Sequence, residues 1–441
     1  MQIKKHLFFT VTIQLITISI LFSQVDCSLT TTDKIPINDL GTGFFMGYQG
    51  GLYPGGTNVI PLLHKQAGNN IGKSIKPLNE DGVVDFENGQ VVFAAFGAST
   101  AGNTFNTFKA TVQAVPGIYN PCLKFVNLCM GGKGLETMVP PGNKYYWDYI
   151  ADSLTADGGV TAKQVQIAWI KTASKDDSVP EFPLQADSVY SKYIRSIMRM
   201  KDTFPNLKLL YISSHAYGGY SSEFSDNADL AGEPAAYYGG FAVKWVVGAQ
   251  ISGDPNLVFS GPATEAPWIN WGPYFWADGI TPRVSDGLTW ICSDFDPEGG
   301  GFHLSEEGKQ KEADMMIDNF YAGTSSRKWF RAGPAWAACD PFLRSSNSPT
   351  SYEDSDYFDD ELTIYPSPNN GNFYISFYNV SENPGKIIIL NNQGQEIYEK
   401  EINEAVGDVS INVDLKENAS GIYHVLFEGE AVRIQKTIVV N

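Results

Sequence analysis

The chain has 441 residues, which is more than one average domain needs and suits a large domain joined to a small one. Hydrophobic residues make up 43% of it and charged residues 18%, so it can bury a sizeable core. Its formal net charge of -18 disfavours binding to nucleic-acid phosphates and to anionic membrane surfaces. We therefore expect no nucleic-acid partner and interpret the acidity as a feature that keeps the protein in solution.

The first residues have the pattern of a secretory signal peptide. Lys4 and Lys5 precede an uncharged, largely apolar stretch over residues 7–22, and Ser23 is the small residue at which cleavage is expected. The apolar stretch is shorter than the roughly 20 residues of a membrane-spanning helix, so no transmembrane anchor is expected. We predict a removable signal peptide over residues 1–23.

A lead-in segment over residues 24–45 is followed by a large body that extends to residue 340. In this body, compact apolar runs alternate with helix-sized segments, one of which follows Pro183 over residues 184–203. The runs that predict buried strands are residues 91–96, 124–128, 165–170 and 207–212. This rhythm predicts an α/β domain over residues 46–340, with a parallel sheet between layers of helices.

The last helix of the body has a clear start. Ser305 is a suitable N-cap, and Glu306 and Glu307 stand in the first turn, where the helix dipole favours acids. Apolar residues then recur on one face as far as Phe320, which predicts an amphipathic helix.

The C-terminal part of the chain has a different composition. Residues 341–360 are rich in Ser and acids and predict a solvated linker. In residues 361–441, short apolar runs alternate with the turn sequences YPSPNNG, NNQGQ and ASG, which predicts a small all-β sandwich.

The order of these landmarks, closed by IQKTIVVN, resembles the type A C-terminal sorting domain of type IX secretion cargo. The resemblance implies that the signal peptide directs export across the inner membrane and that the tail directs export across the outer membrane. It also implies the type IX secretion machinery as a partner, and a protein that is secreted or held at the outer-membrane surface. A generic carbohydrate-binding sandwich is the alternative.

The cysteines indicate neither a disulfide scaffold nor a zinc site. Cys122 and Cys129 flank a predicted strand whose ends lie about 20 Å apart, so these two cannot pair with each other. A bridge must go elsewhere, with Cys292 and Cys339 as candidates. Residues 294–299 begin like a calcium loop but lack the glutamate at its twelfth position. We predict no metal and no cofactor.

The body contains three histidines, His64, His215 and His303, from which a serine hydrolase must draw its base. His303 directly precedes the capped helix, and a residue in such a loop can face a cleft. Ser99 follows the first predicted strand, at the carboxyl end where open α/β sheets build their sites. This placement predicts Ser99 as the nucleophile and His303 as its base.

In their order along the chain, the segments FGASTAGNTF, NLCMGGKGLETM, WIKTA and GGGFHLSEEG resemble the conserved blocks of the SGNH (GDSL-type) hydrolases, in a divergent branch. The resemblance covers residues 90–322 and implies a flavodoxin-like fold with a Ser99–His303 pair. It also implies an oxyanion hole formed by the N–H of Gly132 and by Lys171, which stands where the family has an asparagine. Alternatively, Lys171 is one half of a buried ion pair.

The chain departs from the family pattern at the acid of the triad. Ala98 stands where an aspartate usually precedes the serine, and Gly300 stands where an aspartate usually precedes the histidine. We expect Asp294 or Asp296, just upstream, to orient the imidazole. A backbone carbonyl that orients the ring of a Ser–His pair is the alternative, and it implies slower catalysis.

Substrate contacts are predicted near the same end of the sheet. Trp271 and Trp276 lie in the aromatic run PWINWGPYFWADG and suit stacking on sugar rings, although a packed lid over the core is an alternative. His215 and Tyr217 follow the fourth predicted strand and are further candidates.

The predicted function is that of a secreted serine esterase that removes acyl groups, such as acetyl, from carbohydrate. Two alternatives stay open. One is a non-catalytic carbohydrate-binding or surface protein on a degenerate SGNH fold, and the other is an esterase for lipids or small esters.

Overall fold

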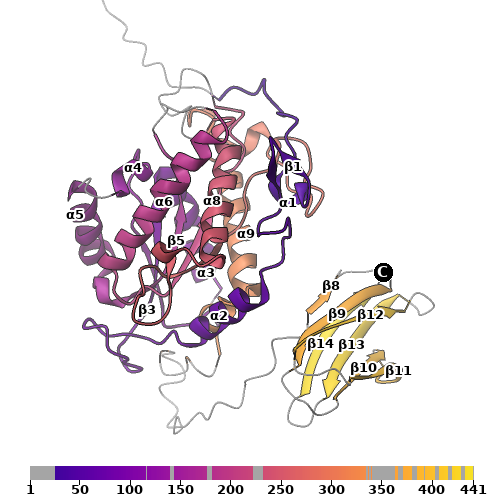
Figure 1. The fold of residues 1–441 in the computed structure, drawn as a ribbon. Coiled ribbons are helices and arrows are strands. Elements are labelled where there is room, and N and C mark those ends of the chain that lie inside the picture. Colours follow the sequence, from indigo (N-terminus) through magenta and orange to yellow (C-terminus); the bar gives the residue numbers. More distant parts are fainter. Residues whose placement is uncertain are drawn as a thin grey trace, which may run out of the picture. The chain divides into compact units, whose positions relative to one another are not determined.

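The computed structural model divides into two compact units, Met1–Ser346 and Asn347–Asn441 (Figure 1), each of which is described on its own. The predicted signal peptide and the predicted linker lie outside the described residues. The described residues are 25–115, 117–139, 144–175, 181–221, 232–333, 336, 339, 363–365, 371–379, 385–391, 393–402, 407–415, 420–428 and 433–440.

A parallel sheet of five strands in the order β4-β3-β5-β6-β7 forms the centre of the first unit. The strands are β3 (Val91–Gly97), β4 (Leu123–Asn127), β5 (Val165–Lys171), β6 (Leu209–Ser213) and β7 (Trp268–Trp271). The four predicted strands are confirmed with small shifts at their ends. β7, which lies in the aromatic run, was not predicted as a strand. Every residue of β3, β5 and β6 is buried, as expected for strands covered on both faces.

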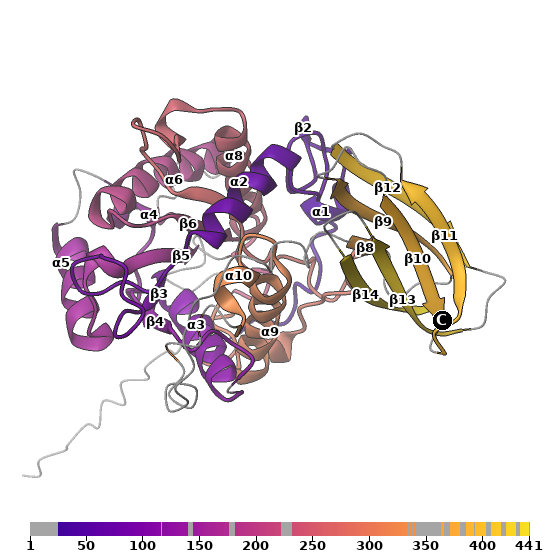
Figure 2. The same cartoon turned by 90° about the horizontal axis from the view of Figure 1, so that it is seen from below.

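Helices cover both faces of this sheet and thereby make the predicted α/β architecture. Figure 2 shows α6 and α8 on one side of the strands and α3 and α9 on the other. The helices are α1 (Ile37–Leu40), α2 (Leu62–Lys73), α3 (Ser99–Gln113), α4 (Leu135–Met138), α5 (Lys144–Ser153), α6 (Leu184–Thr203), α8 (Ala235–Ile251), α9 (Glu306–Ala322) and α10 (Arg327–Phe330). None of the helices in the described ranges combines the length and the apolarity that a membrane span requires.

The two helix starts predicted from sequence are confirmed. α6 begins directly after Pro183, and α9 begins after Ser305. The Ser305 hydroxyl accepts a hydrogen bond from the N–H of Gly308 at 3.3 Å, which satisfies one of the unpaired donors at the helix start.

The segment predicted as a lead-in packs against the body and belongs to the same unit. A disulfide joins Cys27 to Cys292, and the N–H of Asp26 donates to the carbonyl of Tyr220 at 2.9 Å. This segment also contains a short hairpin of β1 (Phe44–Phe45) and β2 (Tyr48–Gln49). The body as folded therefore begins before the predicted boundary at residue 46.

A second disulfide joins Cys122 to Cys339, one of the two partners left open by the sequence. Cys129 is free, in agreement with the expectation that it does not pair with Cys122.

The second unit consists of two antiparallel sheets, with strand orders β11-β10-β13-β14 and β12-β9-β8. Side chains from both sheets, among them Phe373 and Val425, share one hydrophobic core, so the predicted all-β sandwich is present. β11 was not predicted, because its sequence is mostly polar and its side chains are largely exposed. The strands are β8 (Thr363–Tyr365), β9 (Asn372–Asn379), β10 (Gly385–Asn391), β11 (Glu396–Ile402), β12 (Gly407–Asp414), β13 (Gly421–Glu428) and β14 (Arg433–Val440).

Candidate active site

A sharp turn from β3 into α3 places Ser99 at the first position of the helix. Gly97, the last residue of β3, has φ of 138°, and a Cβ added to it would lie 2.2 Å from the carbonyl oxygen of Lys171. Only glycine fits this close approach of two backbones. The first N–H groups of a helix lack acceptors within the helix, so Ser99 lies at an end with positive partial charge.

The structure brings Ser99 and His303 together although 204 positions separate them in the chain. The Ser99 Oγ lies 2.8 Å from the Nε2 of His303, which is hydrogen-bond distance. Burial lowers the pKa of His303, against the opposing effects of the Gly299 carbonyl and the Asp296 charge. The imidazole is therefore neutral near pH 7, which is the state in which Nε2 accepts the serine proton.

The opposite ring nitrogen of His303 faces the backbone. Its Nδ1 lies 3.2 Å from the carbonyl oxygen of Gly299. Because a carbonyl only accepts, this contact favours the tautomer with the proton on Nδ1 and leaves Nε2 to accept from Ser99.

The glycine run before His303 fits this loop against the body. Gly301 has φ of 76°, and a Cβ added to it would lie 1.7 Å from the carbonyl oxygen of Tyr220. A larger residue at this position would displace the loop that carries His303.

The expectation that Asp294 or Asp296 bonds to the imidazole is corrected by this geometry. The Asp294 carboxylate accepts from the Nζ of Lys311 at 2.5 Å and from the N–H of Ile291 at 2.9 Å. Asp296 acts on His303 through its charge, and its N–H donates to the His303 carbonyl at 3.0 Å. Within the described residues, no carboxylate is hydrogen-bonded to the ring. The His303 ring is therefore oriented by a backbone carbonyl, which is the alternative considered from the sequence.

Lys171 forms a buried ion pair, which is the second of the two roles considered for it from the sequence. The prediction that it contributes to the oxyanion hole is therefore corrected. Its ammonium is bonded to the carboxylate of Glu312, and the two side chains are 2% and 0% exposed. Thr104 also contacts this carboxylate, and its Oγ1 lies 3.2 Å from the Lys171 Nζ.

Sequence reasoning missed Glu312, although the helix that carries it offered a signal. Glu312 stands four residues after Gly308 and four before Met316, and all three are buried on the same face of α9. An acid within a buried stripe requires a buried cation or donor. Nothing local in the sequence identifies that cation as Lys171.

Gly132 lies in the loop that follows β4 and has φ of 68°. The N–H of Met130, two residues earlier, donates to the Gly97 carbonyl at 2.9 Å, which fastens the loop to the turn that precedes Ser99. The role of the Gly132 N–H in an oxyanion hole remains a prediction.

Three of the predicted substrate contacts lie inside the body. Trp271, Trp276 and Tyr217 are 3%, 0% and 1% exposed, and the polar tip of each is hydrogen-bonded to another part of the unit. Because their ring faces are packed, the expectation that they stack on sugar is corrected in favour of the packed alternative.

His215 lines a small cavity of about 10 Å³ together with Thr100, Lys171 and Glu312. Among the described residues, its Nε2 has no hydrogen-bond partner. Burial, with a smaller effect of the Lys171 charge, lowers the pKa of His215 to about 3, so the ring is neutral near pH 7. His64 belongs to the core, since its Nε2 contacts the Ile269 carbonyl at 2.8 Å.

Over the part of the chain that the structure describes, no group of three or more His, Cys, Asp or Glu side chains is arranged to hold a metal ion.

Comparison with known proteins identifies the second unit. Residues 363–441 match the family described as "Secretion system C-terminal sorting domain". The predicted type IX sorting domain is thereby confirmed for this part of the chain. It implies interaction with the type IX secretion machinery, and it indicates secretion with attachment at the cell surface or the outer membrane.

The comparisons do not assign the body to a family. No curated protein matches the sequence. Among solved structures, a family two carbohydrate esterase from Cellvibrio japonicus is 13% identical with a TM-score of 0.29, and the match covers 54% of this chain and 62% of that one. An engineered protein is 10% identical with a TM-score of 0.19, and the match covers 92% and 99%. The Bacteroides uniformis β-glucuronidase is 10% identical with a TM-score of 0.17, covering 68% and 40%. Scores this low carry no argument about the fold or the activity.

Proposed function

We propose that the body is an SGNH-like serine ester hydrolase that removes acyl groups, such as acetyl, from carbohydrate outside the cell. The observation that supports it most is the distance of 2.8 Å between the Ser99 Oγ and the His303 Nε2. The position of this pair, where the first strand of a parallel sheet turns into a helix, is typical of α/β enzymes. The sorting domain supports the choice of substrate because it indicates export, and acylated polysaccharides are among the ester substrates found outside the cell.

The reaction follows from the geometry of the pair. His303 Nε2 takes the proton of Ser99 as its oxygen attacks the ester carbonyl carbon, and the carbonyl oxygen becomes negative. We expect the first N–H groups of α3, with the predicted Gly132 N–H, to donate to that charge. His303 then gives its proton to the departing alkoxide, and a water molecule, deprotonated by the same nitrogen, hydrolyses the acyl-enzyme.

The first prediction concerns the pair itself. In hydrolysis of a chromogenic acetate by the mature protein, Ser99→Ala and His303→Gln are each expected to lower kcat/KM by about 10³-fold or more, because each removes one half of the nucleophile–base unit. Ser188→Ala, on α6, is the matched control and should leave the rate unchanged. If the unmutated protein is no faster than the Ser99→Ala variant on esters of several acyl lengths, the proposal is wrong.

A second candidate function has a specific observation in its favour. The His303 ring is held by a carbonyl and, in the described chain, by no carboxylate, as expected for a fold that has lost its chemistry. A non-catalytic carbohydrate-binding protein is then expected to bind sugar and to show no difference between the unmutated and Ser99→Ala forms in the acetate assay.

A further inference from the structure

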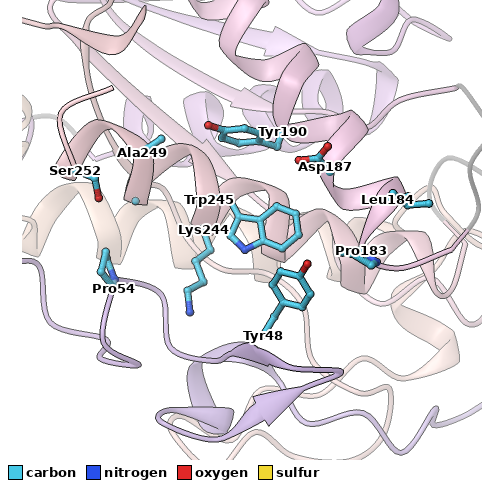
Figure 3. Close-up of a pocket in the computed structure, with 11 residues that line it drawn as sticks. Tyr48, Pro54, Pro183, Leu184, Asp187, Tyr190, Lys244, Trp245, Ala249 and Ser252 are labelled. Carbon is cyan, nitrogen blue, oxygen red and sulfur yellow. The ribbon is translucent and has the colours of Figure 1, made fainter. Parts of the chain in front are cut away.

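A cavity of about 650 Å³ lies away from the Ser99–His303 pair, between the β1–β2 hairpin, the start of α6 and the second half of α8 (Figure 3). The side chains of Tyr48, Asp187, Tyr190 and Trp245 line it, and neither Ser99 nor His303 does. Its volume falls in the range of small-ligand sites, ~300–1,000 Å³, and is large enough for a few sugar units.

We propose that this cavity is a second sugar-binding site, which holds a segment of neutral carbohydrate chain. The proposal extends the proposed function, because a polymer held here stays close to the protein while its esters are presented to Ser99.

The aromatic side chains of the cavity suit the apolar faces of pyranose rings. In Figure 3 the indole of Trp245 lies at the centre of the cavity, with Tyr48 on one side and Tyr190 on the other. The ring centroids of Tyr48 and Trp245 are 5.3 Å apart, and their planes are inclined by 43°. Unlike the buried tryptophans of the aromatic run, Trp245 is partly exposed and Tyr48 is 38% exposed. Part of each ring is therefore accessible to a ligand.

Polar groups beside these rings suit sugar hydroxyls. Asp187 is exposed, and within the described part of the chain its carboxylate makes no hydrogen bond or ion pair. A carboxylate accepts two hydroxyl hydrogen bonds from one sugar and repels an anionic one. The ligand class that fits is therefore a neutral sugar and not a uronic acid.

The hairpin wall of the cavity is held in place before a ligand binds. Lys244 of α8 is 8% exposed, and its Nζ donates to the carbonyl of Gln49 at 2.5 Å and to that of Gly50. The ring of Tyr48 also packs edge-on against Phe182 at 5.1 Å. Because the wall is already fixed, little ordering cost accompanies binding. Lys244 itself is occupied and does not offer its charge to an anionic ligand.

The test uses the mature full chain with Ser99→Ala, which prevents turnover of any ester. Binding of xylohexaose, cellohexaose and a galacturonic-acid hexamer is measured by titration calorimetry. At least one neutral hexasaccharide is expected to bind saturably and more tightly than the acidic one. Trp245→Ala should weaken that binding by about tenfold or more, because it removes the central stacking face. Asp187→Asn should weaken it by a smaller factor.

The matched control is Tyr145→Ala, an aromatic residue on α5 that is 63% exposed and lies outside the cavity, and it should not change binding. If Trp245→Ala melts at a lower temperature than its parent, Tyr48→Ala replaces it, because Tyr48 is at the surface of the hairpin. The proposal is overturned if no probe binds saturably, if the acidic hexamer binds most tightly, or if Trp245→Ala and Tyr48→Ala bind like the parent.

These outcomes are separable from those of the proposed function. With Ser99 restored, hydrolysis of a small chromogenic acetate by the otherwise unmutated protein, with Tyr145→Ala as its control, tests the esterase on its own. If sugar binding depends on Trp245 but the protein with Ser99 intact hydrolyses no ester, the esterase proposal is wrong and the second site stands. An active esterase without such binding contradicts the second site alone.

Discussion

The two nitrogens of His303 have different partners, and this difference sets the chemistry of the site. Nε2 faces Ser99 at 2.8 Å, and Nδ1 faces the Gly299 carbonyl at 3.2 Å. When the ring takes the serine proton, the imidazolium is stabilised by a carbonyl dipole and by the nearby charge of Asp296. A directly bonded carboxylate would stabilise it more strongly. We therefore expect a working Ser–His pair whose rate is below that of a full triad.

The pH dependence of the acetate hydrolysis is predicted at the same scale. Burial lowers the pKa of His303 below its usual value of 6.5, so the base stays neutral, and active, to lower pH. The acid limb of kcat/KM is expected to have its midpoint below pH 6.5, with activity lost as the pH falls through that lowered pKa.

The Asp296 charge raises the pKa of His303, so Asp296→Asn should move the acid limb to still lower pH. Asp294→Asn is the matched control and should move it less, because Asp294 is paired with Lys311. An acid limb that moves upward in Asp296→Asn would contradict the assignment of His303 as the base.

Among the helices and strands, a cluster of three buried polar side chains connects the three elements that shape the site. Lys171 ends β5, Thr104 lies on α3, which begins at Ser99, and Glu312 lies on α9, which follows His303. Their side chains meet in the interior. This connection fixes α3 and α9 relative to the sheet, and therefore fixes Ser99 relative to His303.

Breaking the buried pair is expected to destabilise the body. Lys171→Met and Glu312→Gln should each lower the free energy of unfolding by about 3–5 kcal/mol, because each leaves a buried partner unpaired. The double change Lys171→Met with Glu312→Gln should cost less than the sum of these two single changes, because neither charge is then left without its partner. Denaturant unfolding of the mature protein measures both.

The control is Lys144→Met on α5, whose ion pair with Asp148 is at the surface and should contribute little. If Lys171→Met unfolds at the same denaturant concentration as Lys144→Met, the buried pair does not have the structural role given to it.

In the whole molecule, the segment after residue 24 fastens the loop that carries His303. The Cys27–Cys292 disulfide attaches it 11 residues before His303. The N–H of Val25 donates to the Pro297 carbonyl at 3.2 Å within that loop, and Asp278, after β7, accepts at 2.7 Å from the N–H of Thr32. The site is therefore assembled from both ends of the first unit.

Removal of this disulfide is expected to lower both stability and activity. Cys27→Ser with Cys292→Ser opens a link between residues 265 positions apart, and a long closed loop of this kind contributes about 2–5 kcal/mol. The melting temperature should fall, and kcat/KM should fall with it because the His303 loop loses an anchor. The control Cys129→Ser removes a cysteine that forms no disulfide. A double variant that melts and hydrolyses like the control would show that the link is dispensable.

Local sequence was enough to predict most of the strands, two of the helices and the sorting domain of the tail. Apolar runs predicted four of the five central strands, Pro183 and Ser305 marked two helix starts, and the landmarks of the tail identified its sorting domain. These features depend on residues that are close together in the chain, so local sequence patterns predict them. The order of motifs also predicted the pairing of Ser99, which follows the first strand, with His303, which precedes the last helix of the body.

The partners of the buried and site residues became known from the fold and could not be predicted from local sequence. The partner of Lys171 is Glu312, which lies 141 positions away in the chain. Trp271 and Trp276, predicted to stack on sugar rings, are buried where β7 pairs with the sheet and the chain continues beyond it. The partner of His303 Nδ1 is a backbone carbonyl, which no side-chain pattern encodes. The burial of a side chain and the partner of a buried charge depend on how distant segments pack, so local sequence sets neither.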